Sequence, residues 1–410
     1  MSDFHQTGVI TTLHRLGPRS TERIESDLKH HARERPLGLV LPCLYTEVDG
    51  PGLARILEVT REVSYLQRVI VSVSGTSNRE EFDAVRKFFA PVPEATCVWA
   101  SGPTVGESIE RLEENGLHIG PDGKGRAVWI GAGFALACGD VDSLVLHDCD
   151  IVTYDREFLA RLCFPVTHPG LDFEFSKGYY GRATNRLHGR VTRLFVTPLL
   201  RSLKQILGSL PLLEFLDSFR YPLAGEIAIK ANLMRQIRIP SHWGLEIGTL
   251  AEVFRNCSPQ RVSQVELCDN YDHKHQPLSS EDPSRGLHRM VRDIAASLFQ
   301  NLASVGLQFD SGFLNTLCAA YLREAQDAVT RYADEALING LLFDQHDEEV
   351  IVETFTAGLR AAGLAFVRSP LGSPLIPNWS RVTAALPELL TDLRYAVELD
   401  RRSSSPRRPR

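Results

Sequence analysis

Short apolar runs alternate with helically spaced segments from residue 37 to about residue 150. The apolar, β-branched runs begin at Leu37 (LGLVLPCLY), Gln67 (QRVIVSVS), Thr96 (TCVWAS) and Asp142 (DSLVLHD), and they predict strands. Between them, GPGLARILEVTREV, REEFDAVRKFF, VGESIERLEENG and GRAVWIGAGFALACG have the spacing of helices. This alternation implies an α/β fold with a parallel, right-handed sheet that binds ligands at the carboxyl ends of its strands.

The regularity weakens after Ile151, and residues 170–280 are rich in turns where Gly, Tyr, Arg and His gather. We expect a binding pocket there. From Ser284 to about Arg360 the spacing again predicts helices, and a last helix is expected near Arg381–Leu399. These patterns divide the chain into an N-terminal arm outside the main fold (1–36), a main domain (37–283, with halves 37–150 and 151–283), a helical C-terminal extension (284–399) and a disordered basic tail (400–410).

The composition is that of an ordinary globular protein: 410 residues, of which 43% are hydrophobic and 23% charged. The formal net charge of −6 argues against binding nucleic acid through the overall field, so an anionic ligand has to meet a local basic cluster. Eight cysteines are scattered without a CxxC pair and indicate reduced thiols. The N-terminus lacks a signal-peptide core and no run of about 18 apolar residues occurs, so we expect a cytoplasmic protein that does not enter a membrane.

An acidic pair, Asp148 and Asp150, follows the predicted strand LVLHD. A chain that turns off the edge of a sheet can direct both carboxylates at one ion, and hard divalent metals bind such oxygen ligands. Acidic pairs also occur as loop caps. The position after the fourth strand of a nucleotide-binding-like half favours the metal site.

Two further segments could bind anions. Gly120-Pro121-Asp122-Gly123-Lys124-Gly125 precedes a predicted helix, where backbone N–H groups and Lys124 can meet a phosphate, although it departs from a P-loop and can also be a plain helix-entry loop. A basic cluster follows later in the chain, where arginine forks suit phosphate or carboxylate: Arg182, Arg186, His188, Arg190 and Arg193. Its Gly-containing sequence favours a small anion site over a solvated basic face. In Asp272-His273-Lys274-His275, one histidine could be a metal ligand or a surface residue.

Together these segments resemble, in the same order from about Leu37 to Leu278, the glucosyl-3-phosphoglycerate synthase family of retaining glycosyltransferases with the GT-A fold. The opening strand-end pattern of the family is similar to Pro42-Cys43-Leu44-Tyr45-Thr46-Glu47, its Pro-Gly-Lys-Gly loop to Gly123-Lys124-Gly125, and its Asp-Ser-Asp motif to Asp148-Cys149-Asp150. Its acceptor motif resembles Gly189-Arg190-Val191-Thr192, and later motifs resemble Tyr221-Pro222-Leu223-Ala224-Gly225-Glu226, His242-Trp243-Gly244-Leu245-Glu246-Ile247-Gly248 and Asp272-His273-Lys274-His275-Gln276-Pro277-Leu278. The resemblance implies a Rossmann-like nucleotide-sugar-binding domain and a homodimer through the C-terminal helices.

The resemblance also implies a site. Mg²⁺ or Mn²⁺ would be held by Asp148, Asp150 and His273, and Asp150 and Glu226 would be catalytic, with Glu226 positioning sugar hydroxyls. UDP-glucose or GDP-glucose would be bound by Pro42, Leu44, Thr46, Glu47, Ser74, Lys124 and Asp148. The acceptor 3-phosphoglycerate would be bound by Gly189, Arg190, Thr192 and His275, with its 2-hydroxyl aimed at the anomeric carbon. Retention without an evident nucleophile would follow from same-face attack.

Departures from the family pattern leave alternatives open. Tyr45 and Cys149 replace an Asn and a Ser on the nucleotide side, and His275 replaces an acceptor-side Asn. A mannosyl-3-phosphoglycerate synthase would use the same scaffold. A nucleotide-sugar-binding protein tethered by the tail, which has five arginines after Asp400, is the non-enzyme alternative.

Overall fold

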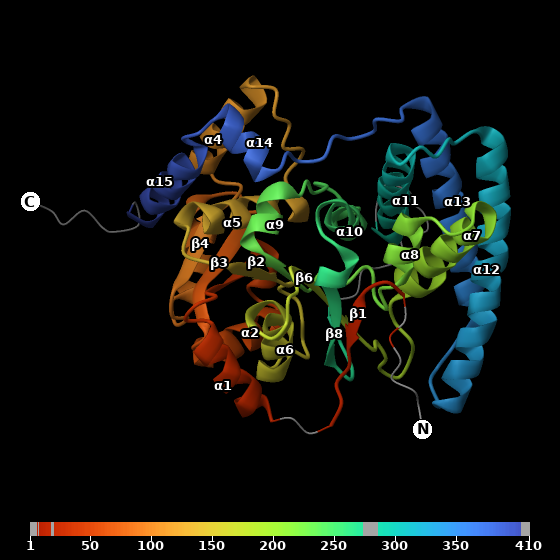
Figure 1. The fold of residues 1–410 in the computed structure, drawn as a ribbon, viewed down its shortest axis with the longest axis horizontal. Helices are drawn as coiled ribbons and strands as arrows, with labels where there is room; N and C mark the ends of the chain where they lie inside the picture. The colour runs from red at the N-terminus through yellow and green to blue at the C-terminus, as the bar shows by residue number, and fades with distance from the viewer. Residues whose placement is uncertain (1–5, 7, 18–19, 274–285, 403–410) are drawn as a thin grey trace, which may run out of the picture.

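The computed structural model describes residues 6, 8–17, 20–273 and 286–402, and these residues contain one eight-stranded mixed sheet (Figure 1). The strand order is β1-β8-β6-β7-β5-β2-β3-β4. The strands are β1 (Thr11–Leu13), β2 (Leu37–Leu44), β3 (Leu66–Ser74), β4 (Ala95–Trp99), β5 (Ser143–Leu146), β6 (Phe175–Tyr180), β7 (Ile227–Lys230) and β8 (Val262–Cys268). β2, β3, β4 and β5 pair in parallel as the sequence predicts, whereas β7 runs antiparallel to its neighbours β5 and β6. The expected α/β class is confirmed, but the sheet is not wholly parallel.

Helices bury both faces of the sheet, which explains why its strands are continuous apolar runs. One face carries α2 (Pro51–Glu62), α3 (Arg79–Phe89) and α6 (Arg156–Thr167), and the other carries α4 (Pro103–Glu114) and α5 (Lys124–Cys138). Alternate strand residues enter the two cores: Val40 and Ile70 pack on one face, and Leu39 and Val71 on the other. The helix α5 lies so close to β2 that a Cβ on Gly131 would meet the Val40 side chain at 2.8 Å.

The N-terminal segment is part of the fold, so the expectation of an arm outside it is wrong for two elements. β1 forms the edge of the sheet by pairing Thr11 with Ser263 of β8. The helix α1 (Thr21–His31) buries Ile24 and Leu28 against α6. A three-residue strand is too short to leave a periodic signal in the sequence.

The second half of the main domain surrounds β6, β7 and β8 with short helices. They are α7 (Thr197–Leu207), α8 (Pro211–Asp217), α9 (Ala231–Gln236), α10 (Leu245–Asn256), the π-helix η2 (Thr192–Val196) and the 3₁₀ helix η3 (Pro259–Arg261); η1 (Tyr45–Glu47) follows β2 in the first half. The eight cysteines are free, as the sequence predicts.

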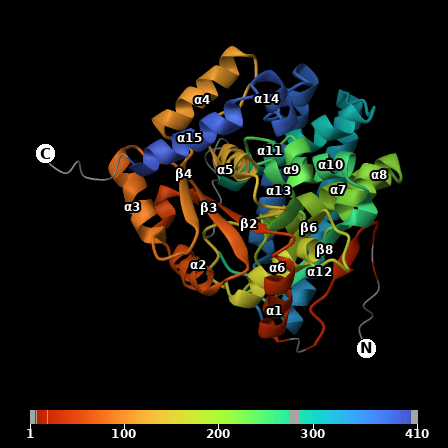
Figure 2. The same cartoon turned by 60° about the vertical axis from the view of Figure 1, so that its left-hand side comes forward.

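The C-terminal helices form two separate groups (Figures 1 and 2). The first is a bundle of α11 (Gly286–Ser304), α12 (Ser311–Ile338) and α13 (Gln345–Arg368), which packs against α7 and α10. Of the described helices, α13 alone is long and apolar enough to span a membrane by length and composition, and it packs against α11 and α12.

The last two helices return to the first half of the main domain. The expected helix Arg381–Leu399 is two helices, α14 (Trp379–Ala385) and α15 (Leu389–Arg402), because Pro387 interrupts it. Figure 2 shows α15 beside α4, and it also packs on α5. Trp379 anchors this return by stacking on Trp129 of α5, with ring centroids 3.9 Å apart.

Candidate active site

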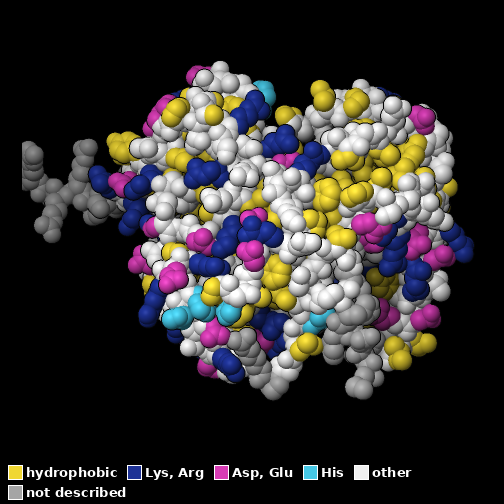
Figure 3. All heavy atoms as spheres, viewed as in Figure 1, with side chains coloured by type: hydrophobic (Ala, Val, Ile, Leu, Met, Phe, Trp, Pro, Cys, Tyr) yellow, Lys and Arg dark blue, Asp and Glu magenta, His cyan; other side chains and the backbone are white. Residues whose placement is uncertain are grey.

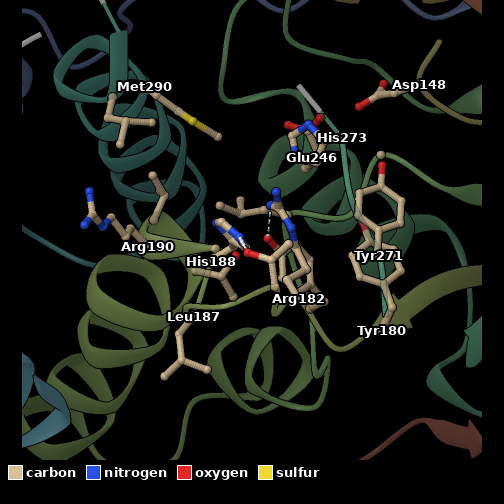
Figure 4. A pocket seen from close by; sticks show the side chains of 18 of the residues that line it. Asp148, Tyr180, Arg182, Leu187, His188, Arg190, Glu246, Tyr271, His273 and Met290 are labelled. Carbon is tan, nitrogen blue, oxygen red and sulfur yellow. Dashed lines mark hydrogen bonds between the residues drawn. The ribbon is translucent and has the colours of Figure 1, made fainter. Parts of the chain in front are cut away.

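A cavity of about 570 Å³ lies where the carboxyl ends of the central strands meet the helical bundle (Figure 4). Its lining comes from segments far apart in the sequence. Asp148 follows β5, Tyr180 ends β6, His273 follows β8, Glu246 lies in the first turn of α10, and Met290 belongs to α11. The cavity therefore joins both halves of the main domain and the C-terminal bundle.

Lys124, the first residue of α5, lines this cavity and bridges two carboxylates. Its Nζ lies 2.7 Å from Asp148 Oδ1 and 3.1 Å from Glu246 Oε1. Burial opposes the charge of Lys124, but the two carboxylates raise its pKa overall, and Lys124 in turn holds the pKa of Asp148 below its ordinary value against the effect of burial. A Cβ on Gly225 would lie 2.9 Å from Asp148 Oδ2, so glycine is needed there for the backbone to approach the carboxylate.

His147 fixes the turn that presents Asp148. Its ring is buried, with Nδ1 2.9 Å from the carbonyl oxygen of Asp148 and Nε2 2.9 Å from the Tyr154 hydroxyl. Burial lowers the pKa of His147 to about 4, so the imidazole is neutral near pH 7. In the matching tautomer, Nδ1 donates to the carbonyl and Nε2 accepts from Tyr154.

The side chains of Asp150, which follows β5, and His273, which follows β8, lie next to each other. An antiparallel bridge pairs Ile151 with His273, and the His273 Nδ1 lies 3.3 Å from Asp150 Oδ2. Within the described residues, no group of three or more His, Cys, Asp and Glu side chains is placed to hold one metal ion. Two of the three expected ligands are therefore together, whereas Asp148 faces Lys124, and the three-ligand metal site stays a prediction.

The segment expected to bind the acceptor lines another wall of the cavity. Gly189 has φ +69, and its Cβ would lie 3.1 Å from the Tyr221 hydroxyl, so glycine suits both the conformation and the close approach. Arg190 donates from Nε to Glu348 Oε1 at 2.8 Å, and in Figure 4 it points away from Asp148 and His273. The Thr192 Oγ1 is buried with no hydrogen-bond partner among the described residues. His275 lies outside those residues.

Glu226 does not line the cavity, contrary to the expected contact with sugar hydroxyls. It is fully buried, and its two carboxylate oxygens accept hydrogen bonds from the hydroxyls of Tyr180 (2.7 Å) and Tyr271 (2.8 Å). The two tyrosine rings are stacked, with centroids 3.9 Å apart, and both line the cavity. Burial, followed by the charge of Asp148, raises the pKa of Glu226. The Glu226 carboxylate therefore does not reach the cavity, but it holds the hydroxyls of the two tyrosines that line it, which we call the tyrosine wall.

The residues expected on the nucleotide side lie at neighbouring strand ends. Leu44 of β2 pairs in register with Ser74 of β3, and Thr46 and Glu47 lie in η1 just beyond. Pro42 lines a small cavity of about 40 Å³ that Lys124 and Asp148 also line. The carboxyl ends of β2, β3 and β5 therefore bring these residues to one edge, as the parallel pairing predicts.

Some lining residues had no expected role in the sequence analysis. Glu246, Tyr221 and Tyr271 are the clearest of them, whereas Arg182 belongs to the basic cluster expected from the sequence to bind an anion. Glu246 and Tyr221 fall inside segments that resemble family motifs, so the resemblance could have drawn attention to them. No local signal shows that the hydroxyl of Tyr221 and the ring of Tyr271 would both contact Arg182.

A curated relative decides the family. Glucosyl-3-phosphoglycerate synthase from Persephonella marina is 45% identical over 401 residues, which cover 98% of this chain and 99% of the relative. The chain belongs to the glucosyl-3-phosphoglycerate synthase family. The enzyme of the same name from Methanococcoides burtonii is 36% identical and covers 97% of this chain and 98% of the relative. No family model matches the chain.

Solved structures of this family share the fold. The glucosyl-3-phosphoglycerate synthase from Mycobacterium tuberculosis, in complex with Mn²⁺, UDP and phosphoglyceric acid, is 26% identical with a TM-score of 0.51, covering 74% of this chain and 88% of that chain. Structures of the same protein with Mg²⁺ and UDP, and with Mn²⁺, UDP-glucose and phosphoglyceric acid, match equally well. The predicted GT-A fold and family are confirmed.

Proposed function

We propose that the protein transfers glucose from a nucleoside diphosphate glucose to the 2-hydroxyl of 3-phosphoglycerate, with retention at the anomeric carbon, and forms glucosyl-3-phosphoglycerate. One observation carries the proposal: a single cavity joins Asp148, Lys124 and His273 at the strand ends to the Gly189–Thr192 segment. A donor diphosphate and an anionic acceptor can therefore meet in one space. UDP-glucose is the first donor to test, because the mycobacterial relative binds it.

The residues at the strand ends fit a divalent cation. The carboxylate of Asp150, the ligand type that Mg²⁺ and Mn²⁺ prefer, already lies beside the imidazole of His273, which is a common metal ligand when neutral. Asp148 would complete the set if its carboxylate turned from Lys124. Such an ion would supply a Lewis acid that takes up negative charge on the departing diphosphate.

The side chains of this chain position the two substrates. Lys124 places a positive charge beside Asp148, where a phosphate or a sugar hydroxyl can displace part of the ion pair. The buried Thr192 hydroxyl and the backbone at Gly189 offer hydrogen bonds to the acceptor. The tyrosine wall excludes water on the side of Glu226. Retention then follows when the acceptor 2-hydroxyl attacks the anomeric carbon on the face from which the diphosphate leaves, with the departing phosphate oxygen accepting the hydroxyl proton.

A panel of donors tests this function against its closest alternative, mannosyl transfer. The protein is incubated with Mg²⁺, 3-phosphoglycerate and either UDP-glucose, GDP-glucose or GDP-mannose, and the products are identified by mass spectrometry. We expect a hexosylated phosphoglycerate from a glucose donor. Product from GDP-mannose alone would instead favour the mannosyl enzyme, and binding of donors without any product would favour the non-catalytic alternative.

We further propose that the protein is a cytoplasmic homodimer that does not bind nucleic acid or membranes. Figure 3 shows hydrophobic side chains gathered over the C-terminal helices. The exposed large apolar residues in and beside the helices of this bundle are Val305, Leu337, Ile338, Leu342, Val350, Leu364, Val367 and Leu371. Light scattering during size-exclusion chromatography tests the dimer, and a Leu337→Glu, Ile338→Glu variant should shift it to a monomer if this surface is the contact.

A further inference from the structure

Arg182 lines the cavity and lies two residues after the end of β6 (Figure 4). Its terminal nitrogen Nη1 donates to the Tyr221 hydroxyl at 2.9 Å. Its guanidinium also lies over the ring of Tyr271, 5.6 Å from the centroid. The Tyr271 hydroxyl donates to Glu226 and its ring stacks on Tyr180, so Arg182 lies over an aromatic ring that two other residues hold in place.

The charge of Arg182 has no carboxylate partner among the described residues. Arg190, which also lines the cavity, and Arg193 differ, because both form ion pairs with Glu348. Arg186, the third lining arginine, is exposed, so solvent can hydrate its charge. The Nε atom of Arg182 is buried, and none of the described residues accepts a hydrogen bond from it. An uncompensated, largely enclosed guanidinium is costly, and a bound oxyanion that accepts from two of its donors would compensate it.

Arg182 belongs to the same wall as the segment expected to bind the acceptor. The Tyr221 hydroxyl that it holds lies 3.1 Å from the position of a Cβ on Gly189. The backbone N–H of His188 donates to the Arg182 carbonyl oxygen at 3.0 Å, which closes the loop between them. Thr192, whose buried hydroxyl also has no described partner, lines the same cavity.

We propose that Arg182 binds one of the two anionic groups of the acceptor, its carboxylate or its phosphate, and thereby determines acceptor specificity. The inference rests on the proposed function, since it assumes an acceptor with these groups. Arg190, turned toward Glu348, then borders the acceptor site, while Arg182 supplies the positive charge at its centre. The planar fork of arginine suits either oxyanion, and lysine would reproduce the charge but not the paired donors.

The test compares wild type with Arg182→Gln, Arg182→Lys and the matched control Arg220→Gln. Arg220 also lies over a tyrosine ring, that of Tyr179 at 5.1 Å, but it does not line the cavity. The KM for 3-phosphoglycerate and for UDP-glucose is measured, together with competitive inhibition constants for D-glycerate and glycerol 3-phosphate. The first inhibitor lacks the phosphate and the second lacks the carboxylate.

We expect Arg182→Gln to raise the KM for 3-phosphoglycerate by about 10- to 100-fold, with a smaller rise in Arg182→Lys and none in Arg220→Gln. The KM for UDP-glucose should stay within about twofold, which a merely structural role would not give. Weaker inhibition by glycerol 3-phosphate alone assigns the phosphate to Arg182, and weaker inhibition by D-glycerate alone assigns the carboxylate.

An unchanged KM for 3-phosphoglycerate, or an equal loss for donor and acceptor, would overturn the inference. A failure of the proposed function is distinguishable, because wild type itself would then not glucosylate 3-phosphoglycerate. Active wild type with a normal acceptor KM in Arg182→Gln refutes only the role of Arg182.

Discussion

Glu348 of α13 links the C-terminal bundle to Arg190 and Arg193, in and beside the segment proposed to bind the acceptor. Its charge should be needed for both stability and acceptor binding. It is 4% exposed and forms ion pairs with Arg190 (2.8 Å) and Arg193. The Arg193 side chain is 7% exposed and also lies over the ring of Tyr332. Replacing Glu348 by Gln keeps the size but leaves the Arg193 guanidinium buried without a counter-charge.

Breaking a buried ion pair by removing one partner typically costs about 3–5 kcal/mol, because the remaining charge stays desolvated. The one-third exposed Arg190 adds little, since solvent screens it. We therefore expect Glu348→Gln to lower the free energy of unfolding by about 3 kcal/mol. Glu324→Gln is the matched control, because Glu324 of α12 pairs with two half-exposed arginines, Arg201 of α7 and Arg331 of α12. This replacement should cost less than about 1 kcal/mol.

Urea unfolding followed by tryptophan fluorescence measures both variants near pH 7. In the same preparations, the KM for 3-phosphoglycerate should rise in Glu348→Gln, because Arg190 loses its anchor, while the KM for UDP-glucose changes little. Combining Glu348→Leu with Arg193→Met should recover stability, since it removes both charges together. Equal losses in Glu348→Gln and Glu324→Gln would refute the reasoning.

Three further predictions concern the proposed metal site, the buried residue Lys177, and the helices α14 and α15. Asp150→Asn should lower kcat at least about 100-fold at saturating Mg²⁺ with little change in melting temperature, and near-normal turnover would remove Asp150 from the metal site. Burial lowers the pKa of Lys177 to about 8 from 10.5, so the cost of its charge is fully present below pH 8 and disappears as pH rises through 10.5. The difference in unfolding free energy between Lys177→Met and wild type should therefore change in favour of wild type by about 3 kcal/mol from pH 7 to pH 10.5. Urea titrations measure this difference, and a pH-independent value would contradict the lowered pKa. Trp379→Ala should cost about 3–5 kcal/mol of unfolding free energy by removing the stack on Trp129, which calorimetry can check, and a loss below about 1 kcal/mol would show that α15 docks without it.

The sequence predicts those parts of the fold whose signal is local. β2, β3, β4 and β5 are continuous apolar runs because helices cover both faces, and such runs are visible without any partner. β1 has three residues, and its place is set by Ser263 and its neighbours on β8, far along the chain. The antiparallel direction of β7 is likewise decided by its pairing with β5 and β6, which local pattern does not encode.

The candidate site follows the same division. Lys124, Asp148, Asp150 and His273 could be found because each lies in a short motif, and the strand ends bring them together. Glu226 could not be placed correctly from its motif, because it is buried and its carboxylate accepts hydrogen bonds from two tyrosines of different segments. The partners of the arginines could not be predicted, because Glu348 lies 158 residues beyond Arg190.

The anomeric configuration of the product tests the central claim most directly. The protein is incubated with Mg²⁺, UDP-glucose and 3-phosphoglycerate, and the reaction is followed by proton and carbon NMR. We expect loss of UDP-glucose with matching formation of UDP and a single product, in which α-linked glucose is attached to the 2-oxygen of 3-phosphoglycerate. A β-linked product, free glucose in place of the glycoside, or no consumption of UDP-glucose and the other glucose donors would contradict it.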